Sequence, residues 1–138
     1  MKPVDATVYV LDDDVSVRRG LERLLRSAGL RVVTFGSARE FLDYRDDVPS
    51  SCLVLDIRMP GQNGLDLHES LNSSGRSIPV VFITGNGDVP MAVRAMKAGA
   101  VDFLAKPFDD KELLNAVHQA IAHSGRGHRS ASRHGSGA

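Results

Sequence analysis

The sequence predicts an α/β protein built on an open, doubly wound parallel sheet of five strands, (βα)5. Two observations predict this class. Short apolar runs alternate five times with segments of helical period between residues 6 and 122. Most of the runs are nearly continuous in Val, Leu, Ile and Phe, as expected of strands covered on both faces. An eight-stranded barrel needs roughly 250 residues, so a chain of 138 residues is too short for one.

The five apolar runs are the predicted strands. They are TVYVL (7–11), RVVTF (31–35), CLVLD (52–56), PVVFIT (79–84) and VDFLA (101–105). Right-handed crossovers between parallel strands place the intervening helices on both faces of the sheet. In such sheets, ligands bind beyond the carboxyl ends of the strands. We therefore expect the functional residues at those ends.

The first three helices are predicted from their apolar spacing and their start signals. The first runs from about residue 15 to residue 28, where Leu residues recur at three- and four-residue steps, and Gly29 supplies a stop. The second opens with Ser37-Ala-Arg-Glu40, which is a capping box. The third begins after Asn63-Gly64.

The last two helices follow the fourth and fifth strands. One is predicted over residues 88–98 and ends at Gly99. The other follows Asp109, which is a suitable cap. Its apolar stripe consists of Leu113, Leu114, Val117 and Ile121.

Composition predicts one soluble domain and a tail. The chain is 42% hydrophobic and 25% charged, and no apolar run approaches the roughly 20 residues that span a bilayer. The start lacks the apolar core of a signal peptide, so we expect a cytoplasmic protein with no membrane partner. The domain is predicted over residues 1–123, and a flexible Gly/Ser/Arg linker or tail over residues 124–138. A basic arm that binds nucleic acid is the alternative, but the three Arg residues of this tail favour it only weakly.

Cys52 is the only cysteine in the chain. A single cysteine excludes an internal disulfide framework and a multi-cysteine zinc site. Because Cys52 begins an apolar run, we expect a buried, unreactive thiol.

Charged and hydroxyl side chains follow four of the five predicted strands. Asp12 and Asp13 follow the first strand, Asp56 ends the third, Thr84 ends the fourth and Lys106 follows the fifth. Two carboxylates about 4 Å apart repel by several kcal/mol near a protein surface, so a cation is required. Oxygen ligands without thiolate favour a hard divalent cation such as Mg²⁺, which also binds phosphate oxygens. The pattern therefore predicts a site for Mg²⁺ and a phosphoryl group.

Each of these residues alone has a simpler explanation. An Asp at a strand end is most often a helix cap, which is our interpretation of Asp14. A single Lys after a strand is usually solvated. The functional interpretation rests on the convergence of three acids, a hydroxyl and an ammonium at successive strand ends of one sheet.

Four motifs in order resemble the receiver domain of bacterial two-component response regulators. They are DD after the first strand, LVLDIRMPGQNG around the third, FITGNGD after the fourth and FLAKPF after the fifth. The resemblance covers residues 6 to about 122. The run TGNGDVPMAVRAMKAGAVDFLAKPF is similar to the nitrogen-fixation regulator branch, whose members usually carry a helix-turn-helix output domain. The resemblance implies the flavodoxin-like strand order 2-1-3-4-5.

The resemblance also implies a phosphorylation-activated signalling switch rather than an enzyme. Asp56 would be the phosphoacceptor that takes phosphate from a histidine kinase. Asp13, Asp56 and the backbone carbonyl of Arg58 would bind Mg²⁺ directly, and Asp12 would act through water.

Three further roles are implied at the fourth and fifth strand ends. Thr84 and Lys106 would contact the phosphoryl oxygens, and Phe103 would be the aromatic switch. The Lys106-Pro107 peptide would be cis. Phosphorylation would alter the face formed by the fourth helix, fifth strand and fifth helix and favour a homodimer through helix 4 and strand 5. DNA would be bound only through an output domain outside this chain, which is then expected to be a fragment of a longer regulator rather than a stand-alone receiver.

Three rival interpretations remain. An Mg²⁺-dependent phosphatase with an aspartate nucleophile carries Asp-x-Asp, whereas Ile57 and Arg58 follow Asp56. A flavin or nucleotide carrier needs a Gly- or Thr-rich loop where this chain has LDDDVSV. A pseudo-receiver would only bind protein, and the complete set of site residues argues against it. His68, within LDLHES, is predicted to be an ordinary surface residue rather than a phosphodonor.

Overall fold

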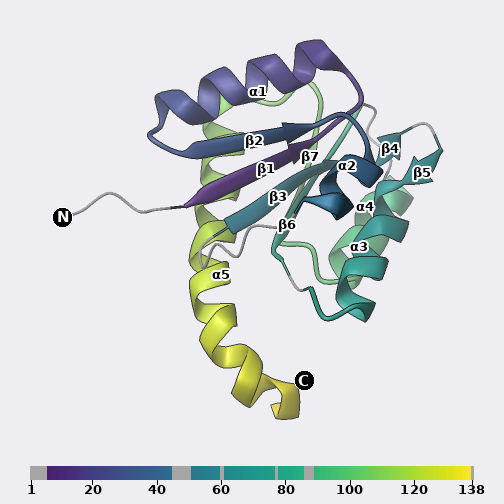
Figure 1. Ribbon diagram of the computed structural model, residues 1–138, viewed down its shortest axis with the longest axis vertical. Helices are drawn as coiled ribbons and strands as arrows, with labels where there is room; N and C mark the ends of the chain where they lie inside the picture. The colour runs from purple at the N-terminus through teal and green to yellow at the C-terminus, as the bar shows by residue number, and fades with distance from the viewer. Residues whose placement is uncertain (1–5, 45–50, 60, 77, 86–88, 138) are drawn as a thin grey trace.

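The computed structural model describes residues 6–44, 51–59, 61–76, 78–85 and 89–137, with backbone alone at residues 62, 89 and 124–137. Its main sheet has five parallel strands in the order β2-β1-β3-β6-β7 (Figure 1). Their bounds are β1 (Thr7–Leu11), β2 (Arg31–Phe35), β3 (Ser51–Asp56), β6 (Val80–Thr84) and β7 (Asp102–Ala105). These are the five predicted strands, so the predicted order 2-1-3-4-5 is confirmed.

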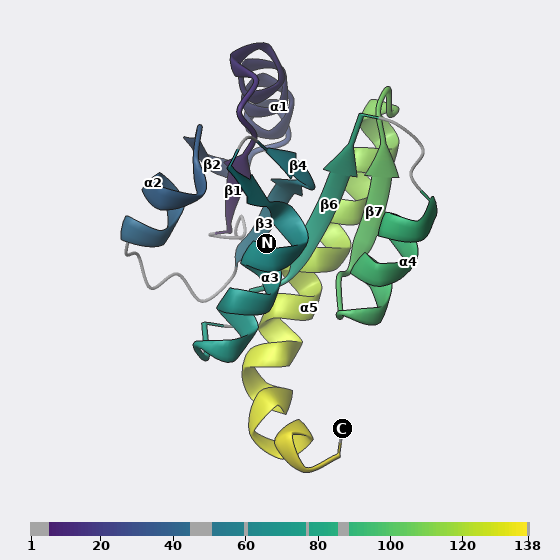
Figure 2. The ribbon, with the colours of Figure 1, turned by 90° about the vertical axis from the view of Figure 1, so that its right-hand side faces the viewer.

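Helices cover both faces of this sheet. They are α1 (Val15–Ser27), α2 (Ala38–Asp43), α3 (Gly64–Ser73), α4 (Val89–Lys97) and α5 (Asp110–Gly137). Side chains of α1 and α5 share one apolar cluster, and those of α2, α3 and α4 share the other. Figure 2 accordingly shows α3 in front of the sheet and α5 behind it. The doubly wound architecture is therefore confirmed.

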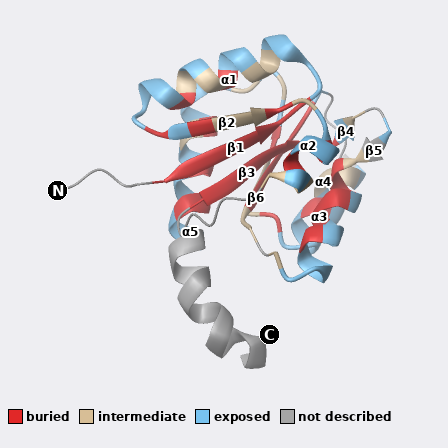
Figure 3. Cartoon of the chain, in the orientation of Figure 1, coloured by how far each residue is buried: buried red, intermediate tan, exposed pale blue. Residues whose placement is uncertain are grey.

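The central strands β1, β3 and β6 are buried because both of their faces pack against helices. In β1, Val8 and Val10 belong to the cluster under α1 and α5, whereas Tyr9 and Leu11 belong to the opposite cluster. All four are at most 2% exposed, and Figure 3 shows β1 and β3 in the red of buried residues, with the largely exposed α1 beside them. Burial on both faces explains why the strand sequences are continuously apolar rather than alternating.

The predicted caps at Asp14 and Ser37 form as expected, whereas Asp109 instead donates its N–H to the Glu112 carboxylate over 3.0 Å. The carboxylate of Asp14 accepts hydrogen bonds from the first turn of α1, and the side chains of Ser37 and Asn63 do the same for α2 and α3. Gly29, which follows α1, has φ 84°, a conformation that glycine adopts without steric cost. These caps make the strand-to-helix turns compact, so α1, α2 and α3 each begin close to the end of the preceding strand.

A short antiparallel ribbon after β3 was not predicted. It pairs β4 (Arg58–Met59) with β5 (Gln62–Asn63). The ribbon returns the chain so that the Gly64 N–H donates to the Ile57 carbonyl over 2.7 Å. A Cβ on Gly64 would lie 2.5 Å from the carbonyl oxygen of Asp56, so only glycine fits there.

Cys52 and His68 both lie inside the protein. Cys52 is fully buried, as predicted, and burial raises the pKa of its thiol to about 12, which disfavours the reactive thiolate. The prediction for His68 was wrong, because this residue is 3% exposed and packs edge-on against Phe82 of β6, with ring centroids 5.5 Å apart. The reason is helical spacing: His68 lies three residues from both Leu65 and Leu71 and shares their buried face.

Helix α5 continues through Gly137, into the segment predicted as a flexible tail. The side chains beyond His123 lie outside the described residues, so the boundary between domain and linker stays a prediction. Within the described part of the chain, no helix combines the length and apolarity needed to span a membrane.

Candidate functional site

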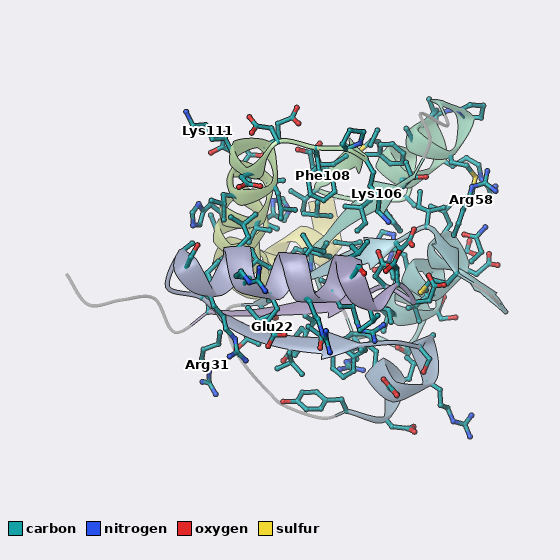
Figure 4. All side chains as sticks on the ribbon, turned by 90° about the horizontal axis from the view of Figure 1, so that it is seen from above. Glu22, Arg31, Arg58, Lys106, Phe108 and Lys111 are labelled. Atoms are coloured by element: carbon teal, nitrogen blue, oxygen red, sulfur yellow. The ribbon has the colours of Figure 1, made fainter. Side chains whose placement is uncertain are left out.

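The predicted site residues meet at the carboxyl end of the sheet. Asp12 and Asp13 lie in the turn between β1 and α1, Asp56 is the last residue of β3, and Thr84 is the last residue of β6. Lys106 follows β7. In Figure 4, Lys106 and Arg58 lie at the same end of the molecule. The structure thus brings together residues that are up to 94 positions apart in the sequence.

Three carboxylates form a tight cluster in this site. Asp12, Asp13 and Asp56 each offer an oxygen, and these oxygens lie within 4.8 Å of one another. Asp12 is 0% exposed and Asp56 is 5% exposed, whereas Asp13 is exposed. Charges of one sign at this spacing repel strongly when they are buried, so the cluster requires positive charge nearby.

Lys106 supplies part of that charge. Its Nζ lies 3.3 Å from Oδ2 of Asp12 and 3.9 Å from Oδ2 of Asp56. The Lys106 N–H donates to the Thr84 carbonyl over 2.7 Å, which fixes the backbone from which the side chain extends. The Lys106-Pro107 peptide is cis, as the resemblance implied.

The pKa of Asp56 shows that Lys106 only partly offsets the negative charge of the cluster. Burial, together with the charge of Asp12, raises the pKa of Asp56 from 3.8 to about 6, against the opposing effects of Lys106 and of a hydrogen bond from the Arg58 N–H. The carboxylate is still mostly ionised at neutral pH. A further cation at this place would stabilise its charged form.

The donor set fits a hard divalent metal ion. The three Asp residues offer only oxygen atoms, and no His or Cys belongs to the cluster, which is the one such group among the described residues. Arg58 follows Asp56 by two residues on β4, and its N–H is bonded to the Asp56 carboxylate. Oxygen donors of this kind suit Mg²⁺ better than a soft metal.

Thr84 places a free hydroxyl in the site wall. The residue is 0% exposed, and its Oγ1 has no hydrogen-bond partner among the described residues. A buried hydroxyl without a partner costs about 1–3 kcal/mol. The position is therefore suited to a bound group that accepts a hydrogen bond.

Phe103 precedes Lys106 by three residues. It is half-buried on β7, in register with Phe82 of β6, and packs against the cluster under α2, α3 and α4. This placement is compatible with the predicted switch residue, whose role stays a prediction.

Two residues near the site were not singled out by the sequence analysis. Gly64 allows the close approach to Asp56 described above, and the Asn63-Gly64 pair was interpreted only as a helix start. Arg18 of α1 donates from Nη1 to the backbone carbonyl of Asp12 over 2.7 Å. No sequence spacing identifies that contact, because it depends on the reach of a long side chain.

Known proteins are similar to this chain in sequence. Residues 8–118 match the model of the response regulator receiver domain. Nodulation protein W of Bradyrhizobium diazoefficiens is 59% identical over 112 residues, which are 81% of this chain and 49% of that protein. The transcriptional regulatory protein FixJ of Azorhizobium caulinodans is 48% identical over 122 residues, or 88% of this chain and 58% of that protein. The chain therefore spans about half the length of these curated relatives.

Solved structures share the fold. FixJ-N matches with a TM-score of 0.81 at 45% identity, covering 88% of this chain and 97% of that chain. The response regulator StyR matches with a TM-score of 0.85 at 49% identity, covering 94% of this chain and 66% of that chain. The predicted resemblance to the nitrogen-fixation regulator branch is confirmed by the FixJ matches. The chain belongs to the family of response regulator receiver domains.

Proposed function

We propose that this chain is a phosphorylation-activated switch in which Asp56 accepts a phosphoryl group from a histidine kinase with Mg²⁺ as cofactor. One observation carries the proposal: the buried carboxylate of Asp56 lies 3.9 Å from the ammonium of Lys106 and within 4.8 Å of oxygens from two further carboxylates. Asp13, Asp56 and the Arg58 carbonyl would hold the metal ion, and Asp12 would act through water. When bound, Mg²⁺ would neutralise charge on the transferred oxygens.

The transfer is a nucleophilic substitution at phosphorus. An Asp56 oxygen forms a bond to phosphorus while the bond from phosphorus to the kinase histidine nitrogen breaks, and the leaving imidazole keeps that electron pair. The carboxylate needs no general base, because a pKa of about 6 leaves it ionised at neutral pH. Charge spreads over the phosphoryl oxygens in the transition state, where Lys106 stabilises it.

The phosphoryl group would then change the packing near Thr84. The Thr84 Oγ1, which has no partner among the described residues, donates a hydrogen bond to a phosphoryl oxygen. Thr84 moves toward Asp56, and the ring of Phe103 enters the volume that Thr84 leaves. A local charge is thereby converted into a change of shape at β7 and α4.

The output surface is the face formed by α4, β7 and α5. Val93 and Met96 of α4 are 46% and 47% exposed, and residues three apart lie on one side of a helix. We propose that phosphorylation pairs two copies of the chain through α4 and β7, which would cover these side chains. In a cytoplasmic full-length regulator, this pairing would control an output domain that binds DNA.

Incubation with Mg²⁺ and a small acyl phosphate tests the proposal. The expected result is a single, hydroxylamine-labile phosphoryl adduct with no sustained turnover of phosphoester substrates. Continued turnover would instead support a phosphatase, and no adduct at all would support a pseudo-receiver. Sedimentation with and without beryllofluoride, a phosphoryl mimic, tests the pairing, which we expect only with the mimic.

A further inference from the structure

Asp12 is held by four hydrogen bonds. Its N–H donates to the Phe35 carbonyl over 3.2 Å, its Oδ1 accepts from the Asp14 N–H over 2.9 Å, and its Oδ2 accepts from Lys106 over 3.3 Å. The fourth bond joins Nη1 of Arg18 to the Asp12 carbonyl over 2.7 Å. The Arg18 bond is the shortest of the four, and its donor is a side chain to which the mechanism above gives no role.

The carbonyl that Arg18 binds belongs to the peptide that leads into Asp13. Asp13 is the exposed member of the acidic cluster, and within the described residues no group forms a hydrogen bond or ion pair with its side chain. Its carboxylate is therefore positioned by the backbone alone. The orientation of the Asp12-Asp13 peptide, which Arg18 fixes, determines where that carboxylate points.

The guanidinium of Arg18 occupies a space that depends on Gly36. A Cβ built on Gly36 would lie 3.1 Å from Nη1 and 3.5 Å from Cζ of Arg18. Gly36 is itself fixed, since its N–H donates to the Glu40 carboxylate over 2.9 Å. A methyl group at position 36 would thus press on the guanidinium, which would have to shift by a few tenths of an ångström from its place.

Helix electrostatics do not explain a cation at this position. Arg18 lies in the first turn of α1, where the helix dipole disfavours positive charge. The contact with the Asp12 carbonyl does explain it, because a charged donor forms a stronger bond than a neutral one.

We infer that Arg18 is a positioning residue for the metal site, holding Asp13 in its ligating place through the Asp12 carbonyl, in space that Gly36 leaves open. The inference rests on the proposed function, since it assigns Asp13 to Mg²⁺. Groups that orient metal ligands in this way typically contribute a factor of about 10–100 in metal affinity.

Four variants test the inference, with the Mg²⁺ dissociation constant measured by calorimetric titration. Arg18→Ala is expected to weaken Mg²⁺ binding about tenfold. Gly36→Ala is also expected to weaken Mg²⁺ binding. The matched controls are Arg19→Ala, which removes an exposed neighbouring arginine, and Gly20→Ala, whose added Cβ meets nothing within 4 Å. Both controls should bind Mg²⁺ like the parent.

A second measurement separates positioning from a general loss of structure. At saturating Mg²⁺, Arg18→Ala should accept phosphate from an acyl phosphate at the parental rate, because excess metal offsets a weak site but does not repair a damaged fold. In an Asp13→Asn background, Arg18→Ala should change Mg²⁺ affinity by less than about twofold, since the ligand it orients is gone.

Parental Mg²⁺ affinity in Arg18→Ala would overturn the inference, as would a full tenfold loss in the Asp13→Asn background. Neither result would affect the proposed function. That proposal would fail separately if the parent chain accepted no phosphoryl group.

Discussion

Two threonine hydroxyls lie buried at opposite ends of the same sheet, and neither has a hydrogen-bond partner in the described part of the protein. Thr84 ends β6 and is 0% exposed, whereas Thr7 begins β1 and is 2% exposed. The backbone carbonyl of Thr84 accepts a hydrogen bond from the backbone N–H of Lys106, and the ammonium of Lys106 lies 3.3 Å from Asp12 in the acidic cluster. Thr7 instead lies in register between Arg31 and Ser51. The comparison teaches that an unpartnered hydroxyl does not mark a site unless charged groups surround it.

We expect the carboxyl end of the sheet also to lower the stability of the metal-free fold. Asp12 and Asp56 are buried close to one another, with only Lys106 against them at hydrogen-bonding or ion-pair distance among the described side chains. At the amino end, no comparable cluster of acidic side chains is found among the described residues. Proteins retain such local conflicts mainly at functional sites, so the acidic cluster at one end of the sheet is itself a functional signal.

Loss of the ammonium should have the largest effect. We expect Lys106→Ala to slow phosphorylation by an acyl phosphate about a hundredfold, because it removes charge stabilisation from the transition state. Arg31→Ala, at the amino end, removes one cation as well and should leave the rate unchanged. Rates of adduct formation measured by intact mass would check both variants. Equal slowing of phosphorylation in Lys106→Ala and Arg31→Ala would contradict the proposed difference between the carboxyl and amino ends of the sheet.

Neutralisation of Asp56 should stabilise the metal-free protein. Its folded pKa of about 6 exceeds the ordinary value of 3.8, so the folded state binds more protons than the unfolded state between these values, and stability falls as pH rises through that window. Asp56→Asn should therefore raise the free energy of unfolding by about 1–3 kcal/mol at pH near 7.5 in EDTA. Urea unfolding should show this gain vanish near pH 4. A variant less stable than the parent at neutral pH would contradict the argument.

The two threonines provide a matched pair. Thr84→Val and Thr7→Val each remove an unpartnered buried hydroxyl at nearly constant volume, so each should stabilise the protein by up to about 1 kcal/mol. Only Thr84→Val should lose the beryllofluoride-induced dimer. Thermal unfolding and sedimentation would measure the two properties, and loss of dimer formation in Thr7→Val would remove the functional distinction between the ends.

Replacement of His68 should have the smallest effect, a change in how stability depends on pH. Burial lowers its pKa from the ordinary 6.5, so below pH 6.5 the unfolded state binds a proton that the folded state resists, and stability falls as pH falls. The change has the opposite sign to that of Asp56. Replacing His68 with Leu should remove this pH dependence below pH 6.5, as measured by urea unfolding. An unchanged pH profile would show that His68 is readily protonated in the folded state.

Much of the fold could be predicted because the strand signal was strong. The ranges 7–11 and 31–35 match β1 and β2. Parallel strands bring their carboxyl ends to one edge, so the proximity of Asp12, Asp56 and Lys106 followed from topology alone. Side-chain reach, burial and backbone approach require coordinates.

Three features show where sequence patterns were insufficient or were not fully used. The ribbon of β4 and β5 has two-residue strands, which are too short to show a period. His68 was misplaced although its spacing from Leu65 and Leu71 indicated a buried face. The contact of Arg18 with the Asp12 carbonyl depends on a side-chain conformation that no spacing encodes.

The central claim is that the acidic end of the sheet exists to let Asp56 become phosphorylated. The most direct test is peptide mapping of the chain after treatment with an acyl phosphate, in parallel with Asp56→Asn and with an EDTA-treated sample. We predict a phosphoryl group on Asp56 in the presence of Mg²⁺ and none in the other two samples. An equal yield of phosphoprotein from Asp56→Asn would contradict the claim.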